Sequence, residues 1–567
     1  MSSTTPLTPD DRPTKRAKTE ELDESMTASE SNGAKKEEPV VEDIDDEVDP
    51  YAGYEEKQGK TRAADMYLDT VNRAALDFDF EKVCSVSMSN QNIYGCLVCG
   101  KYFQGRGKSS HAYAHSIHED HHVFIHLETT EVYVLPDGYQ VSDPSLDDIK
   151  YVLSPRFSQA QIAKLRTDPN VQTSYDLSSR PYIPGYIGLQ NIKRNDYLSV
   201  IVHALLHVPP VRDFLLAMDG SAQSTPKPKP GAAPAKPVKQ PSELVRRFAG
   251  LAKKVWNPRL FKSQVSPHEF LQEVARVSAG RFKITEQGDP VEFLGWLLNR
   301  VHADLGGTKK RGSSIIYSTF QGEVRLETQQ VIVKADAASG VKPHFDIDRG
   351  KPASLLVIML PTLLLSNSLC ILNPEIKQTT SPFLLLALDL PPPPLFQDAV
   401  EKNIIPQVSL ATLLGKYDGK TTQEFAGQLK RFRCTKLPPY IILHFKRFTK
   451  NNFVEEKNPT IVNFPIDGVD FSQVLERRSE AAGTPIIYDL VANITQESAA
   501  GTTHDKESTV WKIHLRAGRG EREQWLQIQD MIVEETRKEM IFLGETVVQI
   551  WELSQRAPGK GKEKAQS

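Results

Sequence analysis

The chain has 567 residues, which is too long for one hydrophobic core and predicts about two to four domains. Its formal net charge of -3 excludes a global polycation that would hold nucleic acid by counterion release, so protein partners are favoured. Five cysteines in so long a chain exclude an extracellular disulfide framework and favour a reducing compartment, either the cytosol or the nucleus.

Residues 1–61 are rich in Glu, Asp, Lys, Ser and Thr. We predict a disordered arm here, because so few apolar side chains cannot offset the entropy cost of ordering. The first residues lack the apolar core and the cleavage pattern of a signal peptide. A basic cluster in this arm is typical either of a nuclear import signal or of a solvated charge run: Arg12, Lys15, Arg16 and Lys18.

A region crowded with Cys and His follows, and we predict a first domain over residues 62–165. Cys96 and Cys99 form a C-x-x-C turn, and His115 and His121 lie in the His-rich loop and helix after it. Two thiolates and two imidazoles can close a tetrahedral shell around zinc and supply folding energy to a small domain. The alternatives are a redox pair, which needs no downstream histidines, and unrelated surface histidines. We predict one structural Zn²⁺.

Cys84 and His111 indicate a second, degenerate metal site. Ser87 stands where another cysteine would complete a second C-x-x-C, and Gln104 is no soft ligand. We therefore expect no second ion in this domain.

The stretch YGCLVCGKYFQGRGKSSHAYAHSIHEDHH resembles the zinc finger of ubiquitin-specific proteases. Many fingers of that family grip the C-terminal Gly-Gly tail of free ubiquitin. The resemblance implies that Arg106, in the pair Gly105-Arg106, would contact the tail. The region of Tyr133, however, lacks the tryptophan often found in that pocket. Ubiquitin binding and a protein-docking or structural role both remain open for this finger.

Residues 180–555 are predicted to form a second domain, interrupted by a Pro- and Lys-rich linker at 221–241 and followed by a disordered tail at 556–567. GLQNIKRNDYLSVIVHAL, QGDPVEFLGWLLNRVH and KLPPYIILHFKRF resemble the cysteine box, a helix and a palm strand of the same proteases. YDLVANI and WLQIQDMIV resemble the strands that carry the histidine and its acidic partner. Periodicity alone indicates α+β. The resemblance implies a small UBP-type zinc finger followed by a papain-like ubiquitin-specific-protease fold with thumb, palm and fingers.

A cysteine protease needs a thiolate, an imidazole and a group that orients the imidazole. The resemblance places Asp196 at the thiol position, Val510 at the histidine and Gln529 at the orienting residue. A carboxylate is a poor nucleophile toward an amide, and valine transfers no proton. His504 and His514 lie near Val510, but neither rescues a site without a thiol. We predict a pseudoenzyme that has no catalytic residues.

The apolar stretch at residues 350–375 is an anomaly. A transmembrane helix is one interpretation, but Pro361, Ser366 and Asn367 interrupt the run and no basic flank orients it, so we expect no membrane partner. The other hypothesis is a translated, unremoved intron, because Gly350-Lys351 is what the splice-donor consensus GGTAAG would encode in frame. Cys370 and Cys434 stand alone, so we expect no zinc in the fingers.

Several longer stretches, among them YLDTVNRAALDFDFEKVCSVS, WNPRLFKSQVSPHEFLQEV, LGGTKK and FTKNNFVEEKNPTIVNFPI, identify a narrower relationship. They closely resemble the ubiquitin-specific-protease-like splicing factors of the spliceosomal tri-snRNP, the snRNP assembly-defective protein family. The resemblance implies a nuclear, noncatalytic scaffold that promotes tri-snRNP assembly or stability. It implies tri-snRNP proteins as partners, including the unwinding helicase and the core scaffold. A ubiquitin-binding adaptor and an active deubiquitinase are the alternatives.

Two basic clusters are candidates for contact with small nuclear RNA phosphates. A solvated face or a strand end is the favoured interpretation of both, because no aromatic platforms are interleaved with the charges. The clusters are Lys309, Lys310 and Arg311, and Lys446, Arg447 and Lys450.

Overall fold

The computed structural model describes residues 66–167, 172–218, 241–332, 371–372, 376–392, 405–425, 428–450, 455–476, 485–498 and 509–554. Several predicted segments lie outside these ranges. They are the arm at 1–61, the linker at 221–240, nearly all of the apolar stretch at 350–375, and the tail at 556–567.

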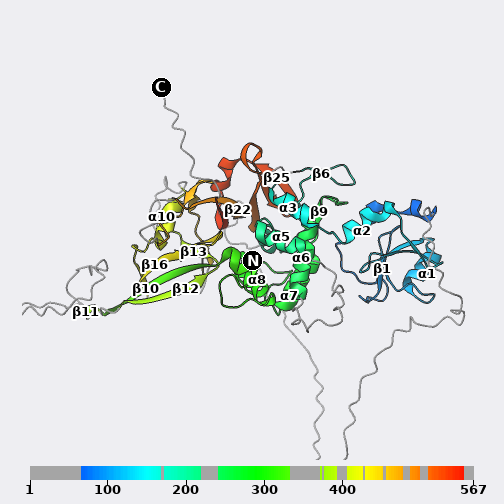
Figure 1. Cartoon of the computed structure of the whole chain (residues 1–567), viewed down its shortest axis with the longest axis horizontal. Helices are drawn as coiled ribbons and strands as arrows, with labels where there is room; N and C mark the ends of the chain where they lie inside the picture. Colours follow the sequence, from blue (N-terminus) through cyan, green and yellow to red (C-terminus); the bar gives the residue numbers. More distant parts are fainter. Residues whose placement is uncertain are drawn as a thin grey trace, which may run out of the picture. The chain divides into compact units, whose positions relative to one another are not determined.

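The first folded part is a five-stranded antiparallel sheet with strand order β2-β1-β3-β4-β5 (Figure 1). Its strands are short, and their apolar residues join Leu146 and Ile149 in one core. The strands are β1 (Ile93–Cys96), β2 (Tyr102–Gln104), β3 (Val123–His126), β4 (Val132–Val134) and β5 (Tyr139–Val141). The helices α1 (His111–His118) and α2 (Asp147–Leu153) belong to this part, whereas Ile162 of the following α3 (Gln159–Thr167) lies in the core of the helical part described next.

The next part is helical and corresponds to the predicted thumb. Ser242 caps α6 by accepting the Val245 N–H, and Asp289 caps α8 by accepting the Val291 N–H, with Pro290 as the first helical residue. The helices are α4 (Asp196–Leu206), α5 (Pro209–Ala217), α6 (Glu243–Val255), α7 (His268–Val277), α8 (Pro290–Asp304) and α9 (Ile315–Phe320). Among the described residues, no single helix is long and apolar enough to cross a membrane. The pair α4 and α5 passes the same test only together, with a bend of 91°.

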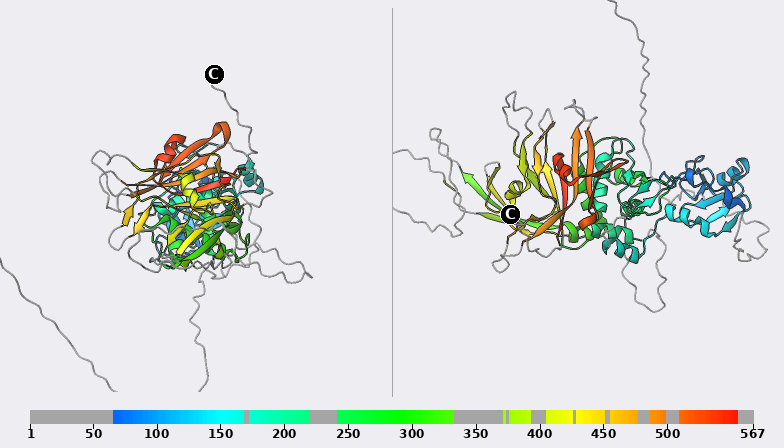
Figure 2. Two further views of the ribbon diagram at one scale, coloured as in Figure 1. Left: turned by 90° about the vertical axis from the view of Figure 1, so that its left-hand side faces the viewer. Right: turned by 90° about the horizontal axis from the view of Figure 1, so that it is seen from above.

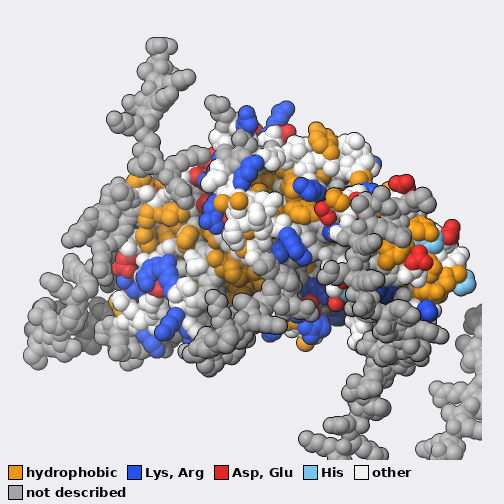
Figure 3. Space-filling view, turned by 45° about the vertical axis from the view of Figure 1, so that its right-hand side comes forward, with side chains coloured by type: hydrophobic (Ala, Val, Ile, Leu, Met, Phe, Trp, Pro, Cys, Tyr) orange, Lys and Arg blue, Asp and Glu red, His pale blue; other side chains and the backbone are white. Residues whose placement is uncertain are grey.

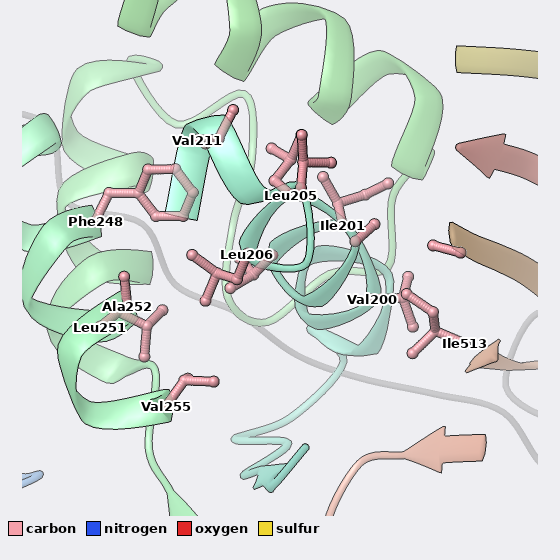
Figure 4. Packing of buried hydrophobic residues seen from close by; sticks show 14 of the residues in the cluster. Val200, Ile201, Leu205, Leu206, Val211, Phe248, Leu251, Ala252, Val255 and Ile513 are labelled. Carbon is pink, nitrogen blue, oxygen red and sulfur yellow. The ribbon is translucent and has the colours of Figure 1, made fainter. Parts of the chain in front are cut away.

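Helix α4 is the centre of the larger core, and every one of its residues is buried. Figure 4 shows its Val200, Ile201 and Leu205 among side chains from α5, α6 and β23. Burying large aliphatic side chains contributes about 1.5–3 kcal/mol each, so this packing fixes the position of the helix and of its first residue, Asp196.

The palm is an eight-stranded sheet with the main order β13-β17-β26-β22-β23-β24-β25. Its later strands are the orange and red ones in Figure 2. Two tryptophans, Trp525 and Trp551, anchor its second core. The strands are β13 (Leu386–Asp389), β17 (Tyr440–Lys446), β26 (Thr546–Leu553), β22 (Ile487–Ser498), β23 (Thr509–Ala517), β24 (Gln524–Gln529) and β25 (Ile532–Thr536), and the short β21 (Val469–Asp470) pairs with β22.

A second sheet forms the fingers. In it β10 (Gly322–Ile332) pairs antiparallel with both β12 (Lys377–Phe383) and β16 (Gln428–Lys436). The end of β10 also pairs with the short β11 (Ile371–Leu372), which falls inside the anomalous stretch. β15 (Gln423–Phe425) completes the sheet. Cys434 on β16 is buried in the palm core, which raises the pKa of its thiol to about 12.

The segment that leads into the zinc finger contacts the thumb through a seam of charges. Lys254 on α6 donates to the Asp79 carboxylate at 2.9 Å and to the Phe78 carbonyl at 3.2 Å. Lys262 pairs with Asp77 at 2.7 Å. The contact also has an apolar component, because Phe261 packs in the core of the finger.

Candidate functional site

The four predicted zinc ligands lie together. The sulfur and ring nitrogen atoms of Cys96, Cys99, His115 and His121 are all within 4.8 Å of one another. The Cys99 Sγ lies 3.4 Å from the His115 Nε2, which lies 3.1 Å from the His121 Nδ1. Ligand atoms at about 2.0–2.3 Å from a tetrahedral zinc have separations of this order. The donor set therefore fits Zn²⁺.

Local structure explains how these ligands meet. Strand β1 ends at Cys96, and the turn after it returns Cys99 to the same side, with the Gly100 N–H bonded to the Cys96 carbonyl. Gly100 has a φ of +77°, and a Cβ there would approach the Ala75 carbonyl oxygen to 2.2 Å, so only glycine fits. His115 lies on α1 and stacks on Phe103 of β2 with ring centroids 4.2 Å apart.

The predicted degenerate site does not gather a metal-ligand set in the described part of the chain. The buried Cys84 sulfur accepts the N–H groups of Val86 and Ser87, and the Ser87 hydroxyl donates to the Gln104 side chain at 2.8 Å. His111 begins α1. Cys84, Ser87 and Gln104 are thus joined by hydrogen bonds where a second set of metal ligands would be expected.

Arg106 lies over the ring of Tyr133, with its guanidinium carbon 4.5 Å from the ring centroid. The Tyr133 hydroxyl donates to Glu131 at 2.9 Å, and Tyr94 meets the Tyr133 ring edge-on. The arginine is exposed on the finger. A cation on an aromatic surface is thus present where the tail contact is predicted.

Asp196 is the first residue of α4 and is 6% exposed. One of its carboxylate oxygens accepts the backbone N–H of Trp511 at 3.2 Å, and Gln287 donates its side-chain amide to both oxygens at 3.4 Å. The same Gln287 amide lies 3.4 Å from the carbonyl of Thr509. Burial raises the pKa of Asp196 to about 6, the Trp511 N–H opposes that rise, and the charge of Asp530 adds to it.

The predicted histidine position, Val510, lies on β23 next to the Trp511 amide that binds Asp196. The assignment of YDLVANI to the histidine-bearing strand is therefore wrong: it forms the neighbouring strand β22. Gln529 ends β24, and the turn that follows begins at Asp530, whose φ is +51°.

Gln287 is a neighbour of Asp196 that the sequence analysis did not single out. It precedes α8 by three residues and is the first residue of QGDPVEFLGWLLNRVH, so the resemblance of that stretch to a family helix was the signal that could have drawn attention to it. His514 is buried and its Nε2 lies 3.1 Å from the Gln527 side chain, so its hydrogen bond is to β24, while His504 lies outside the described residues.

The segment before α4 contacts the turn after β24 through its backbone. The Leu189 N–H donates to the Asp530 carbonyl at 2.9 Å, and a Cβ on Gly188 would come within 2.5 Å of the Met531 Cα.

Of the four described cysteines, three lie in the finger and Cys434 lies in the palm core. No thiol of the described residues thus accompanies Asp196.

The basic cluster that begins with Lys446 lies at the end of β17, in agreement with the favoured strand-end interpretation, and burial excludes one of its members from RNA contact. Arg447 is fully buried and donates to the carbonyls of Asn458 and Thr546, so it cannot touch RNA phosphates. Lys446 pairs with Asp389 at 2.9 Å. Lys309, Lys310 and Arg311 are exposed as expected. On the face in Figure 3, basic and acidic side chains are interspersed around hydrophobic patches.

Comparison with known proteins shows which family models match the chain. The family model described as ubiquitin carboxyl-terminal hydrolase matches residues 187–556, and the model described as a Zn-finger in ubiquitin-hydrolases and other proteins matches residues 84–146. These matches confirm the predicted fold class, an α+β chain with a zinc finger before a protease-like domain.

Two curated relatives align over most of the chain. The probable mRNA-splicing protein ubp10 of Schizosaccharomyces pombe is 43% identical over 531 residues, which cover 92% of this chain and 95% of that protein. Ubiquitin carboxyl-terminal hydrolase 39 of Homo sapiens is 42% identical over 526 residues, which cover 90% of this chain and 84% of that protein.

A solved structure described as an essential yeast splicing factor is similar, with a TM-score of 0.63 and 28% identity. The match covers 86% of this chain and all of that one. The chain therefore belongs to the ubiquitin carboxyl-terminal hydrolase family, in the group that contains these splicing-related proteins.

Proposed function

We propose that this protein is a noncatalytic scaffold of nuclear pre-mRNA splicing. The observation that carries the proposal is similarity over nearly the whole chain to a relative named as an mRNA-splicing protein. A second point supports it: α4 begins at Asp196, and the family resemblance puts this residue at the position where a cysteine protease has its thiolate.

The absence of catalysis rests on three positions together. Asp196 offers a poorly nucleophilic carboxylate, Val510 offers no proton acceptor, and Gln529 has no imidazole to orient. The carboxylate is also occupied by the Trp511 amide and by Gln287. The domain would thus act through its shape and surface rather than through isopeptide hydrolysis.

The finer form of the proposal is that the scaffold promotes assembly or stability of the tri-snRNP. Its finger and protease-like domain would dock on tri-snRNP proteins, including the unwinding helicase and the core scaffold, through interfaces of about 1,600 Å² each. One structural zinc, held by Cys96, Cys99, His115 and His121, would maintain the fold of the finger.

Affinity purification from nuclear extract tests this function. The tagged chain is recovered, its bound proteins are identified by mass spectrometry, and its bound RNA is sequenced, with a tag-only sample as the control. We expect tri-snRNP proteins and their small nuclear RNAs to be enriched together. Recovery of ubiquitin conjugates without snRNP components would contradict the proposal.

The same purification tests the site at Asp196. We expect Asp196→Ala to leave tri-snRNP association and splicing intact, because the residue is only 6% exposed and its carboxylate already accepts hydrogen bonds from Gln287 and from the Trp511 N–H. Loss of association in a variant that keeps its fold would show that this site is part of an interface.

A ubiquitin-binding adaptor is the second candidate, and the stacking of Arg106 on Tyr133 favours it. The test titrates the full chain with ubiquitin that ends in its free Gly-Gly and with ubiquitin lacking those two residues. Binding only to the first, lost in Arg106→Ala and retained in the exposed control Lys108→Ala, would support the adaptor. No binding at high micromolar ubiquitin would leave the scaffold alone.

A further inference from the structure

A pocket of about 460 Å³ lies where a thumb loop meets the edges of the palm and fingers sheets. Its volume is within the range of sites that take a small ligand or a few side chains of a peptide. Its lining mixes aliphatic side chains with polar ones. Leu437, Leu475, Ile486, Ile487 and Leu553 supply the aliphatic part, and Arg311 and Lys436 supply the charged part.

Backbone hydrogen bonds hold the walls of this pocket in place. The Leu553 N–H donates to the Pro439 carbonyl and the Ser554 N–H donates to the Ile487 carbonyl, both at 2.8 Å. Leu475 forms a β-bridge with Cys434. A pocket with fixed walls costs little conformational entropy when it is filled, which favours binding.

The basic side of the pocket is presented by a closed turn. The Thr308 N–H donates to the Ser313 hydroxyl at 3.0 Å, and that hydroxyl donates to the Thr308 carbonyl at 2.7 Å. The turn between them exposes Lys309, Lys310 and Arg311. In the described part of the chain, no hydrogen bond or ion pair engages the Arg311 side chain, so its charge is available to a ligand.

Two acidic groups on the neighbouring strands have cationic partners. Glu323 pairs with Lys436 at 3.0 Å, and Glu476 pairs with Arg325 at 2.7 Å. Of the charged residues in the described lining, Arg311 is therefore the one whose charge is not balanced, and Lys309 and Lys310 are exposed beside it on the same turn.

We infer that this pocket is a docking site for an extended, acidic segment of a partner protein, with an aliphatic or aromatic anchor in the pocket and carboxylates on the basic turn. Charge complementarity favours an acidic occupant. A protein segment is favoured over RNA because Tyr488, the one aromatic residue in the lining, is only 1% exposed and offers no platform for a base. The docking site is inferred from the pocket and its charges and does not rest on the proposed role in splicing.

Fluorescence anisotropy on the purified full chain tests the inference. The probe is a fluorescein-labelled peptide with four acidic residues on each side of a Leu-Phe pair, and the matched probe has Ser-Ser in place of that pair. We expect saturable binding of the first probe, at least tenfold weaker binding of the second, and weakening as salt is raised.

Two variants and one control locate the binding. Arg311→Glu should weaken binding at least tenfold. Leu553→Ser should weaken it about fivefold, and because Leu553 is 40% exposed the fold should survive, as circular dichroism can check. Lys108→Glu makes the same change of charge at an exposed position of the finger and should leave binding unchanged.

Four outcomes would overturn the inference. The first is no saturable binding by the wild-type chain, and the second is equal binding by Arg311→Glu. The third is peptide binding only by a chain ended at Ser554, because then the chain's own tail would be the occupant. A labelled twelve-nucleotide uridine RNA that binds through Arg311 while the peptide does not would assign the turn to RNA and equally refute a protein partner.

Discussion

Asp196 is held by groups from three segments that are far apart in the sequence. The start of α4, the backbone of β23 and the loop before α8 all converge on its carboxylate. An N–H that points at a helix N-terminal carboxylate is a favourable charge-assisted contact. Burial and the nearby Asp530 oppose ionisation of the Asp196 carboxyl group. The free-energy cost of holding this group between thumb and palm therefore depends on pH.

The first prediction concerns that cost. The pKa of Asp196 is raised from 3.8 to about 6 in the folded chain, so its ionisation leaves stability unchanged below about pH 4 and lowers it above about pH 6. Asp196→Asn should therefore have little effect near pH 4 and stabilise the protein near pH 7.5 by on the order of 1–3 kcal/mol. Thermal unfolding at both pH values measures this, with the exposed Asp137→Asn as control. An equal effect at the two pH values would refute the assignment.

The second prediction concerns the metal. Cys96→Ser should abolish zinc binding and unfold the finger at a lower temperature, because a structural zinc supplies folding energy. Cys84→Ser should leave the zinc content at one ion per chain, since Cys84 bonds to backbone N–H groups rather than to other metal ligands. Zinc analysis of the purified variants measures both. Two ions in the wild-type chain, with one lost in Cys84→Ser, would show that the second site is real.

Among the elements, those in stretches that resemble the protease family were predicted well. QGDPVEFLGWLLNRVH contains helix α8, and KLPPYIILHFKRF contains the buried strand β17. The approach of Gln287 to Asp196 could not be predicted, because the two are far apart in sequence and meet only once α4 and α8 pack. Burial of Arg447 was missed for a related reason: its partners are backbone carbonyls, which leave no trace in side-chain patterns.

The third prediction concerns the anomalous stretch. Strands β10 and β12 pair from Gly322–Phe383 to Thr328–Lys377, so the sheet closes on both sides of that stretch. Deleting residues 350–370 keeps these strands and β11, and the shorter connection changes the loop-closure cost by about half a kcal/mol. The melting temperature should stay within about 2 °C of the full chain. A larger loss would show that the stretch belongs to the fold, and sequencing of the cDNA tests separately whether it is a retained intron.

For the molecule as a whole, the charged seam decides whether finger and thumb behave as one body. The Lys254 side chain is 13% exposed and that of its partner Asp79 is 22% exposed, whereas the Lys262 and Asp77 side chains are 45% and 27% exposed. Buried pairs are costly to break because one charge is left unpaired, while exposed pairs contribute little.

The fourth prediction follows from this difference. Lys254→Met should destabilise the protein by about 1–3 kcal/mol and speed proteolysis of the segment around Asp79. Lys262→Met should change stability by less than about 1 kcal/mol. Denaturant unfolding and limited proteolysis compare the two variants. Equal effects on stability would show that burial does not determine how much each of these ion pairs contributes.

The pairing of Val331 and Ile332 with Leu372 and Ile371 sets the two ends of residues 333–370 side by side at one end of β10. Because the two ends are already adjacent, a segment inserted between them does not have to pull the flanking strands apart, and its closure cost grows only slowly with its length. This position is therefore suited to an internal reporter, such as a split fluorescent protein fragment or an affinity epitope. Such an insertion would leave the sequences of the finger, of the segments around Asp196 and of the C-terminal strand β26 unchanged.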